Sequence, residues 1–317
     1  MKVGVVYGGT PEESPASILN ARDAARALEN RGYSVELIEF EKDIISVLKQ
    51  KGCDVVFLCV QGKGYGDGTF QAMLEHEGIA YTGSDMRSAC LINDKILCKL
   101  LFDRCGIRTP EWEILTRRQF DEGNYDYAAF GYPFVAKSPT RGRGFGMSLI
   151  KSEADIPRIM DAFESDDTIF LERYIKGRFF TVGFYEKDGR FEALPVVEGI
   201  DLDHEYDKGN KLITFNTGNF EVKFSDLSDE CNDEILDISR RVCMVTNARG
   251  LARVDLMVSD DDGLPYVLEI NAVPGLKEKS LIPKAAILAG IDYSDMVESI
   301  LRSARSTDSI DKGVAYV

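Results

Sequence analysis

Residues 250–272 read GLARVDLMVSDDDGLPYVLEINA, and this stretch has the clearest structural pattern in the chain. Two apolar runs flank the turn sequence Asp261-Asp262-Gly263, which predicts an antiparallel β-hairpin. Every second residue of a strand lies on the same face of the sheet. Pairing of the two strands can therefore bring polar side chains from both of them to one place.

Four polar residues lie at i, i+2 spacing on this hairpin: Arg253 and Asp255 on the first strand, Glu269 and Asn271 on the second. Asp255, Glu269 and Asn271 offer two carboxylates and an amide oxygen, a set of hard ligands that suits Mg²⁺. Because Mg²⁺ takes few protein ligands and bridges substrate phosphates, the set predicts a nucleotide site. The alternative is a solvated face of an exposed sheet that binds nothing.

The composition is that of a globular protein with room for two or three domains. The chain has 317 residues, of which 44% are hydrophobic and 29% charged. Its net charge of −15 argues against nucleic acid or an anionic membrane as the main partner. No apolar run approaches the roughly 20 residues that span a bilayer. The seven cysteines include no CxxC pair, so a reduced, cytoplasmic setting is expected.

Short apolar runs alternate with amphipathic stretches over the first 60 residues. The pattern predicts strands at Lys2–Tyr7, Ser34–Phe40 and Val55–Val60, and helices at Ser17–Asn30 and Ile44–Lys51. This order is typical of a parallel sheet with helices on its faces. The glycines that follow the first and third strands lie at the carboxyl ends of the strands, where such sheets bind ligands. They do not form the G-x-G-x-x-G sequence of an NAD-binding turn.

The remaining elements are predicted from the same periodicities. We expect helices at Ser88–Cys105, Asp229–Ala248 and Ile282–Ala304, strands at Phe134–Lys137 and Thr168–Glu172, and a hairpin that turns at Lys187-Asp188-Gly189. The last dozen residues are expected to be loose.

Two further segments carry weaker signals for a nucleotide. Lys137 ends a predicted strand and precedes the glycine-rich residues 140–150, TRGRGFGMSLI, whose backbone N–H groups could hold phosphate oxygens. Lys95 could be a second phosphate ligand or simply part of a solvated helix face. Glu172, followed by Tyr174 and Ile175, could accept a hydrogen bond from a nucleobase amine or simply lead a strand into a turn.

Taken together, these segments resemble D-alanine–D-alanine ligase and its ATP-grasp relatives over nearly the whole chain. The segments that carry the resemblance are VVYGGTPEES (5–14), GDGTFQAMLEHEGIAYTGS (66–84), SACLINDKILCKLL (88–101), LERYIKG (171–177) and GLARVDLMVSDDDGLPYVLEINAVPGLKEKSLIP (250–283). The resemblance implies an α/β protein of the ATP-grasp fold. It implies a parallel α/β domain at residues 1–88, a central α+β domain at 89–180 and a C-terminal α+β domain at 181–317.

The resemblance also implies a role for individual residues. ATP would be bound by Lys95, Lys137, Glu172, Tyr174, Ile175, Lys208 and Lys211. One or two Mg²⁺ ions, with Mn²⁺ as an alternative, would be held by Asp255, Glu269 and Asn271. Glu13 would receive the ammonium group of the first substrate, and Arg253 would stabilise the oxyanion. Gly275 and Ser280, with Arg253 and Asn271, would hold the carboxylate of an α-amino-acid acceptor. The implied reaction converts a carboxylate to an acylphosphate, which an amine then attacks.

Several positions depart from the family pattern, and most of them lie on the donor side. Gln61-Gly62 and Gly66-Asp67-Gly68 replace the usual histidine-glycine and Glu-Asp-Gly, and Phe179 replaces an acid that holds the ribose. Arg143 and Gly144 stand where the family has two serines. The mobile loop reads HEYDKGNKLITF, in which Tyr206, Lys208 and Lys211 are candidates for the usual lysine–tyrosine pair. Arg143 is therefore expected to contact a larger or more acidic donor than D-alanine.

Three functions remain open on the sequence. The chain could be a D-alanine–D-alanine ligase with a divergent loop, or a specialised amino-acid ligase of natural-product assembly. It could also be a catalytically silent nucleotide-binding sensor or scaffold, which would have no need of Arg253. The partners expected are a carboxylate donor, an amino-acid acceptor and possible homodimer formation, as in relatives.

Overall fold

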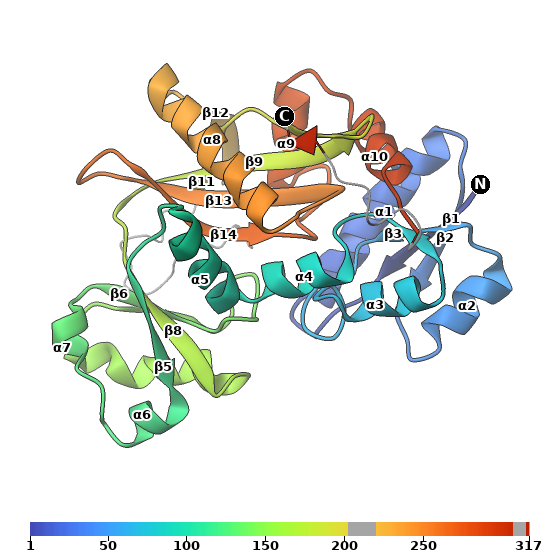
Figure 1. The fold of residues 1–317 in the computed structure, drawn as a ribbon. Helices are drawn as coiled ribbons and strands as arrows, with labels where there is room; N and C mark the ends of the chain where they lie inside the picture. Colours follow the sequence, from blue (N-terminus) through green and yellow to red (C-terminus); the bar gives the residue numbers. More distant parts are fainter. Residues whose placement is uncertain (202–219, 307–314, 317) are drawn as a thin grey trace.

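The computed structural model describes residues 1–201, 220–306 and 315–316, and within them the chain forms successive sheets (Figure 1). The N-terminal sheet is parallel, in the order β2-β1-β3-β4. Its strands are β1 (Lys2–Tyr7), β2 (Ser34–Glu39), β3 (Val55–Leu58) and β4 (Ala80–Tyr81), connected by α1 (Ser14–Asn30), α2 (Ile44–Lys51) and α3 (Thr69–His76). The predicted parallel α/β arrangement is confirmed, although α1 begins at Ser14, before the predicted Ser17.

The second sheet is antiparallel, in the order β5-β8-β6-β7. It contains β5 (Trp112–Thr116), β6 (Phe134–Lys137), β7 (Met147–Ile150) and β8 (Thr168–Arg173), with the short helices α6 (Arg117–Asp121) and α7 (Tyr127–Phe130). The 3₁₀ helix η1 (Glu153–Glu164) packs Ile159 and Phe163 into the core of this sheet. The glycine-rich residues 140–146 form the loop that joins β6 to β7.

The third sheet is built around the long strand β9 (Gly177–Lys187), which pairs with β13 (Leu251–Ser259), β10 (Arg190–Ala193) and β11 (Val197–Asp201). β14 (Pro265–Asn271) pairs with β13, β12 (Phe220–Phe224) with β11, and β15 (Ala315–Tyr316) with β10. Both predicted hairpins are therefore confirmed. The strand β15 shows that the expectation of a loose tail is wrong for these two residues.

Alternation decides which face of this sheet becomes the site. Val254 and Leu256 of β13 point to α8 (Asp229–Val245), whose apolar side packs against them. Arg253 and Asp255 point to the opposite face, near α9 (Leu281–Leu288). Neighbouring residues of the same strand therefore face an apolar core on one side of the sheet and a polar site on the other.

Two predicted helices are each divided in two. The predicted helix at Ser88–Cys105 is wrong, because α4 (Met86–Asn93) ends before Asp94, whose extended backbone (φ −101°, ψ 105°) begins α5 (Lys95–Cys105). The Asp94 side chain accepts a hydrogen bond from the backbone N–H of Leu97, at 3.1 Å, and so caps α5. The predicted Ile282–Ala304 helix is likewise divided into α9 and α10 (Tyr293–Arg302), and Asp292 caps the second.

The first and third sheets share a hydrophobic core. Val3 and Phe57 of the N-terminal sheet belong to the same buried cluster as Ile282 of α9 and Val297 of α10. The second sheet has a core of its own, so it is the part least tied to the others. The expected boundary at residue 180 falls inside β9, which belongs to the third sheet throughout.

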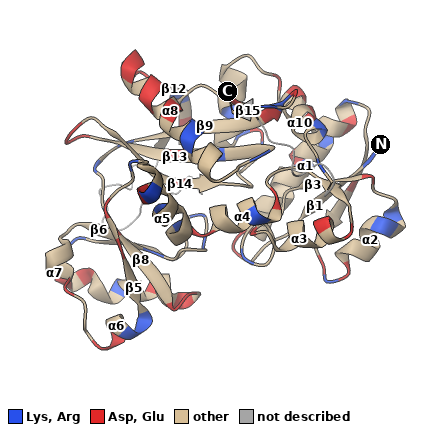
Figure 2. Ribbon diagram, in the orientation of Figure 1, with Lys and Arg blue, Asp and Glu red and all other residues tan. Residues whose placement is uncertain are grey.

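The charged side chains are spread over all parts of the molecule. In Figure 2 the start of α8 is red and α2 carries blue, and neither colour covers one side of the described ribbon in this view. Within the described residues, no helix is both long and apolar enough to cross a membrane.

Candidate functional site

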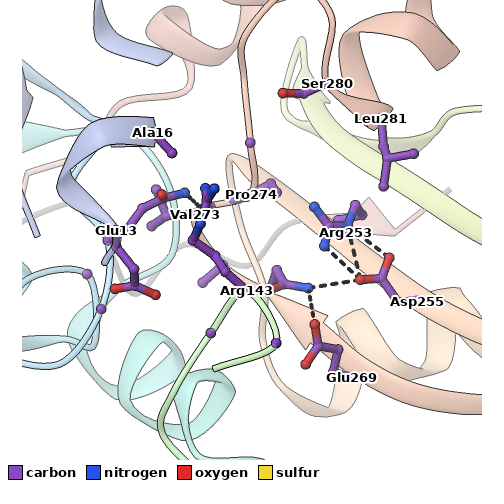
Figure 3. Close-up of a pocket in the computed structure, with 18 of the residues that line it drawn as sticks. Glu13, Ala16, Arg143, Arg253, Asp255, Glu269, Val273, Pro274, Ser280 and Leu281 are labelled. Atoms are coloured by element: carbon purple, nitrogen blue, oxygen red, sulfur yellow. Dashed lines mark hydrogen bonds and ion pairs between the residues drawn. The ribbon is translucent and has the colours of Figure 1, made fainter. Parts of the chain in front are cut away.

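A cavity of about 560 Å³ lies where the N-terminal part, the β6–β7 loop and the third sheet meet. Figure 3 shows side chains from all three parts around it. The expected site residues that line it are Glu13, Lys95, Lys137, Arg143, Arg253, Asp255, Glu269, Asn271, Gly275 and Ser280. Residues from far-apart segments are thus brought together around one space.

The β13–β14 hairpin has the register that the sequence predicts. Arg253 lies opposite Asn271, and Asp255 lies opposite Glu269. Arg253 Nε and Nη2 donate to the two oxygens of Asp255, at 2.8 and 2.7 Å, in a bidentate pair. Asp255 is only 3% exposed, so the alternative of a solvated sheet face is wrong. Thr181 of β9 donates to the same carboxylate at 2.7 Å.

Opposite charges in this cluster stabilise the ionised forms of Arg253 and Glu269. Burial alone would lower the pKa of Arg253, but the Asp255 carboxylate outweighs it and raises the pKa. Burial alone would raise the pKa of Glu269, but Lys95 and Arg253 outweigh it and lower the pKa. Lys95 Nζ lies 3.7 Å from Glu269 Oε2. The lowered pKa keeps Glu269 ionised at neutral pH, as a metal ligand must be.

The donor set fits a magnesium ion. Asn271 Nδ2 lies 3.2 Å from Asp255 Oδ2 and 3.2 Å from Glu269 Oε1, so a positively polarised group already bridges the two carboxylates. A flip of the amide would place its oxygen beside them, which only a bound cation would favour. Among the described residues, no cluster of three or more His, Cys, Asp or Glu residues could hold a metal. Two carboxylates and an amide suit Mg²⁺, which keeps several waters.

Lys95 and Lys137 approach the cavity from different elements. Lys95 is the first residue of α5, and its Nζ donates to the carbonyl oxygen of Arg141 in the glycine-rich loop, at 2.9 Å. Lys137 ends β6 and forms an ion pair with Glu172. Both cations thus flank the loop whose N–H groups were predicted to hold phosphate.

Glu172 does not line the cavity. It is 2% exposed, and its two oxygens are ion-paired with Lys137 and Lys99. Burial alone would raise the pKa of Glu172, but the two lysines outweigh it and lower the pKa. The sequence analysis missed Lys99, although its i+4 spacing from Lys95, between apolar residues, was a usable signal.

The segment after Glu172 provides apolar surface. Ile175 packs against the cluster of Phe179, Met257 and Leu281, and the Tyr174 N–H donates to the carbonyl oxygen of Pro133, at 3.2 Å. Phe179, which replaces the expected ribose-binding acid, also lines the cavity. Phe179 and Leu281 of this cluster therefore give the cavity an apolar border, whereas Tyr174 and Ile175 do not line it.

Glu13 lies at the N-terminus of α1, where its side chain makes no capping hydrogen bond and points to the cavity. Burial raises the pKa of Glu13, and Arg143 and Lys95 oppose this effect. The loop after β14 is held by Asn20, which the sequence analysis missed, and by Gln61, which it named only as a departure from the family pattern. Asn20 Oδ1 accepts from the N–H groups of Leu276 and Lys277, both at 3.0 Å, and Gln61 Nε2 donates to the carbonyl oxygen of Val273, at 3.0 Å.

Three candidates cannot be placed. Tyr206, Lys208 and Lys211 lie outside the described residues. The sequence predictions for this loop therefore stay predictions.

Comparisons of the sequence with known proteins identify relatives of this chain. The family model described as "D-ala D-ala ligase C-terminus" matches residues 101–302. The D-alanine–D-alanine ligase of Magnetococcus marinus is 34% identical, over 96% of this chain and 97% of its own length. The ligase of Desulforudis audaxviator is 32% identical, over 96% of this chain and 98% of its own.

The fold is also similar to that of solved ligase structures. The crystal structure of D-alanine–D-alanine ligase from Bacillus anthracis superposes with a TM-score of 0.80 at 29% identity, covering 96% of this chain and 97% of the other. A second structure of that enzyme, complexed with ATP, gives a TM-score of 0.79. The α/β ATP-grasp fold implied by the resemblance is thereby confirmed, and the chain belongs to the D-alanine–D-alanine ligase family of ATP-dependent carboxylate–amine ligases.

Proposed function

We propose that the chain joins a carboxylate donor to an α-amino-acid acceptor at the expense of ATP, with ADP and phosphate as products. The observation that carries the proposal is the hairpin cluster of Arg253, Asp255, Glu269 and Asn271, which shares one cavity with Glu13 and Ser280. A silent nucleotide-binding protein would need no arginine oriented beside a set of metal ligands. The relatives, moreover, are ligases by name.

In the first step an oxygen of the donor carboxylate attacks the γ-phosphorus of ATP. The bond between γ-phosphorus and the bridging oxygen breaks, and ADP leaves. Lys95 and Lys137 bind the phosphates. Glu172, once Lys137 has exchanged it for a phosphate, accepts from the adenine amine beside Tyr174 and Ile175. Mg²⁺ held by Asp255, Glu269 and Asn271, as one or two ions, would neutralise phosphate charge. Lys208 and Lys211 are proposed to complete the phosphate site.

In the second step the acceptor amine attacks the acyl carbon, and phosphate leaves with the electron pair of the broken C–O bond. The amine gives up a proton as the amide forms. Arg253 stabilises the oxyanion, because its guanidinium is largely shielded from solvent and already oriented by Asp255. Gly275 and Ser280 hold the acceptor carboxylate at the N-terminus of α9, where the helix dipole favours an anion. Glu13 holds an ammonium group of the donor.

We also propose the setting of this reaction. The seven cysteines are free among the described residues, which is consistent with a reducing cytoplasm. The division into domains at 1–88, 89–180 and 181–317 and a homodimeric state are proposed from the resemblance. Light scattering of the purified chain would measure the oligomeric state.

The direct test is ADP release by the purified chain with ATP and Mg²⁺, with D-alanine alone or with mixed amino acids. We expect release that depends on an amino acid, and a product whose mass is that of the two substrates less water. Arg253→Ala should lower kcat by about 10²- to 10³-fold, the loss typical of one oxyanion donor. ATP consumption that no amino acid or carboxylic acid stimulates would exclude the ligase.

A further inference from the structure

We propose that the sugar of the nucleotide lies against Phe179 and that its hydroxyls make no hydrogen bond to the protein, so that the chain uses 2′-deoxyadenosine triphosphate as well as it uses ATP. The inference rests on the proposed function, because it names the nucleotides that the same site accepts. Recognition of the nucleotide is then left to the base and the phosphates. Phe179 is the specificity-determining residue for the sugar.

The register of β9 and β13 places Phe179 directly beside the metal ligands. Asp255 lies opposite Thr181, and Met257 lies opposite Phe179. Residues two apart on a strand share a face, so these four side chains lie on one side of the sheet. The pair of Phe179 and Met257 therefore follows the pair of Thr181 and Asp255 after about 7 Å of strand.

The surface at this point of the sheet is apolar. It consists of a buried cluster, Phe179, Met257 and Leu281, with Ile175 and Leu268 packed against it. Leu268 directly precedes the metal ligand Glu269, whereas Ile175 belongs to the segment proposed to border the base. Figure 3 shows Leu281 on the side of the hairpin where Asp255 lies. Because the sugar of a nucleoside triphosphate lies between its phosphates and its base, it has to lie over this cluster.

The polar side chains next to the cluster are engaged elsewhere. Arg178 Nε and Nη2 donate to the two oxygens of Glu198, at 2.8 and 2.6 Å. The Arg178 guanidinium lies 5.1 Å from the ring centre of Phe180, on the opposite face of the sheet from Phe179. Ser259 is buried, and its Oγ accepts from the N–H of Asp261 at 3.1 Å. Neither Arg178 nor Ser259 is therefore available to the sugar.

A carboxylate would be the natural acceptor for sugar hydroxyls. Within the described part of the chain, the carboxylates that line the cavity are those of Glu13, Asp23, Asp255, Glu269 and Glu278. Glu13 lies at the start of α1, and Asp23 accepts from the N–H of Glu278 in the loop after β14, at 3.2 Å. Asp255 and Glu269 belong to the metal set. None of the five belongs to the apolar cluster around Phe179.

An apolar surface discriminates weakly between a sugar with a hydroxyl and one without. A site that hydrogen-bonds a substrate hydroxyl rejects the analogue that lacks it by about 10⁴- to 10⁵-fold, because its own polar groups are left unpaired. No such penalty arises against a phenyl ring. A hydroxyl that faces water keeps its water, and one that faces Phe179 loses it at a cost. Removal of the hydroxyl is therefore neutral or favourable.

The experiment compares four nucleotides on the full chain with Mg²⁺: ATP, 2′-deoxyadenosine triphosphate, 2′,3′-dideoxyadenosine triphosphate and inosine triphosphate. Calorimetry without amino acids gives Kd, and release of the nucleoside diphosphate with amino acids gives kcat/KM. We expect both deoxy nucleotides to bind within about threefold of ATP, or more tightly. Inosine triphosphate has a carbonyl in place of the base amine, so it should bind about 10- to 100-fold more weakly.

A new carboxylate at position 179 should create the missing discrimination. Phe179→Glu offers the hydroxyls an acceptor, so ATP should bind about tenfold more tightly than the dideoxy nucleotide. Phe179→Leu stays apolar and should leave the ratio of the two Kd values unchanged. Phe224→Glu is the matched control, because Phe224 is 47% exposed on β12 of the same sheet and does not line the cavity. If Phe179→Glu does not fold, the comparison of nucleotides in the unaltered chain still decides.

Two results would overturn the inference. One is an unaltered chain that binds ATP more than about tenfold more tightly than both deoxy nucleotides, since the hydroxyls would then have an acceptor. The other is a ratio of Kd values that Phe179→Glu changes no more than Phe224→Glu does, which would place the sugar away from Phe179. Binding without any amino-acid-dependent release of ADP would instead refute the proposed ligase and leave the sugar assignment standing.

Discussion

At the scale of single residues, the least expected feature is the buried trio of Glu172, Lys99 and Lys137. Lys99 is 1% exposed and also donates to Thr109 Oγ1, at 2.5 Å. A lysine so deeply buried cannot leave for a phosphate, whereas Lys137 lines the cavity and can exchange Glu172 for one. Lys99 is therefore a positioning residue: it keeps Glu172 ionised and oriented after Lys137 has turned to the nucleotide.

Replacing Lys99 should make ATP binding depend on pH. In Lys99→Met one of the two cations that lower the pKa of Glu172 is lost while burial remains, so this pKa rises. As pH falls through the raised pKa, Glu172 is protonated and accepts less well from the adenine amine. We expect KM for ATP to rise by about 10- to 100-fold on the acidic side and to be restored at higher pH.

The readout is KM for ATP measured across pH, with kcat followed separately. Lys176→Met is the matched control, because Lys176 follows Glu172 closely in the chain but its side chain is 76% exposed. A purely structural role of Lys99 would raise KM by the same factor at every pH. That result would remove Lys99 from the nucleotide site.

At the scale of elements, the sequence predicts strands better than it predicts where helices end. The hairpin of β13 and β14 was predictable because alternation and the Asp-Asp-Gly turn are both local signals. The break at Asp94 was not, because Asn93-Asp94 lies within a continuous apolar periodicity. The break matters for the site, since it makes Lys95 the first residue of α5 and turns it to the loop carbonyl of Arg141.

At the same scale, α1 contacts the loop after β14 through Asn20. Asn20 is 2% exposed and accepts from two backbone N–H groups of that loop. Asn20→Ala leaves both donors unpaired, at a cost of about 1–3 kcal/mol each. The loop carries Gly275 and leads to Ser280, so we expect KM for the acceptor to rise about tenfold while KM for ATP stays within about twofold.

Asp23→Ala is the control for this variant. Asp23 accepts a single, exposed hydrogen bond from the Glu278 N–H, at 3.2 Å, on the same helix and loop. Its loss should change the acceptor KM by less than about twofold, because exposed donors can bond to water. Equal effects of the two variants on KM for ATP and for the acceptor would mean that α1 supports the whole fold rather than the acceptor loop.

At the scale of the whole molecule, the site could be predicted only in part from the sequence. Arg253 and Asn271 were found because they share one hairpin, and Glu13 and Lys95 were assigned through the resemblance. Asn20 and Thr181 were missed and Gln61 was given no role, because each acts through a contact made only when distant elements pack. A buried polar residue has no local pattern that separates it from an exposed one. The cavity itself depends on three parts that meet, which no single segment encodes.

Because three parts of the molecule border the cavity, nucleotide and metal together should stabilise the folded chain. A ligand that binds only the native state, at 100 times its Kd, contributes about 2.7 kcal/mol, or roughly 5 °C in Tm. We expect ATP with Mg²⁺ to raise Tm by this amount, and ATP with EDTA to raise it less. Glu269→Gln removes one metal carboxylate, so the Mg²⁺ concentration that gives half the shift should rise at least about tenfold. Asp262→Asn, at the exposed turn of the same hairpin, should leave this Mg²⁺ concentration unchanged. If Glu269→Gln also leaves the Mg²⁺ concentration for half the Tm shift unchanged, the metal site is refuted.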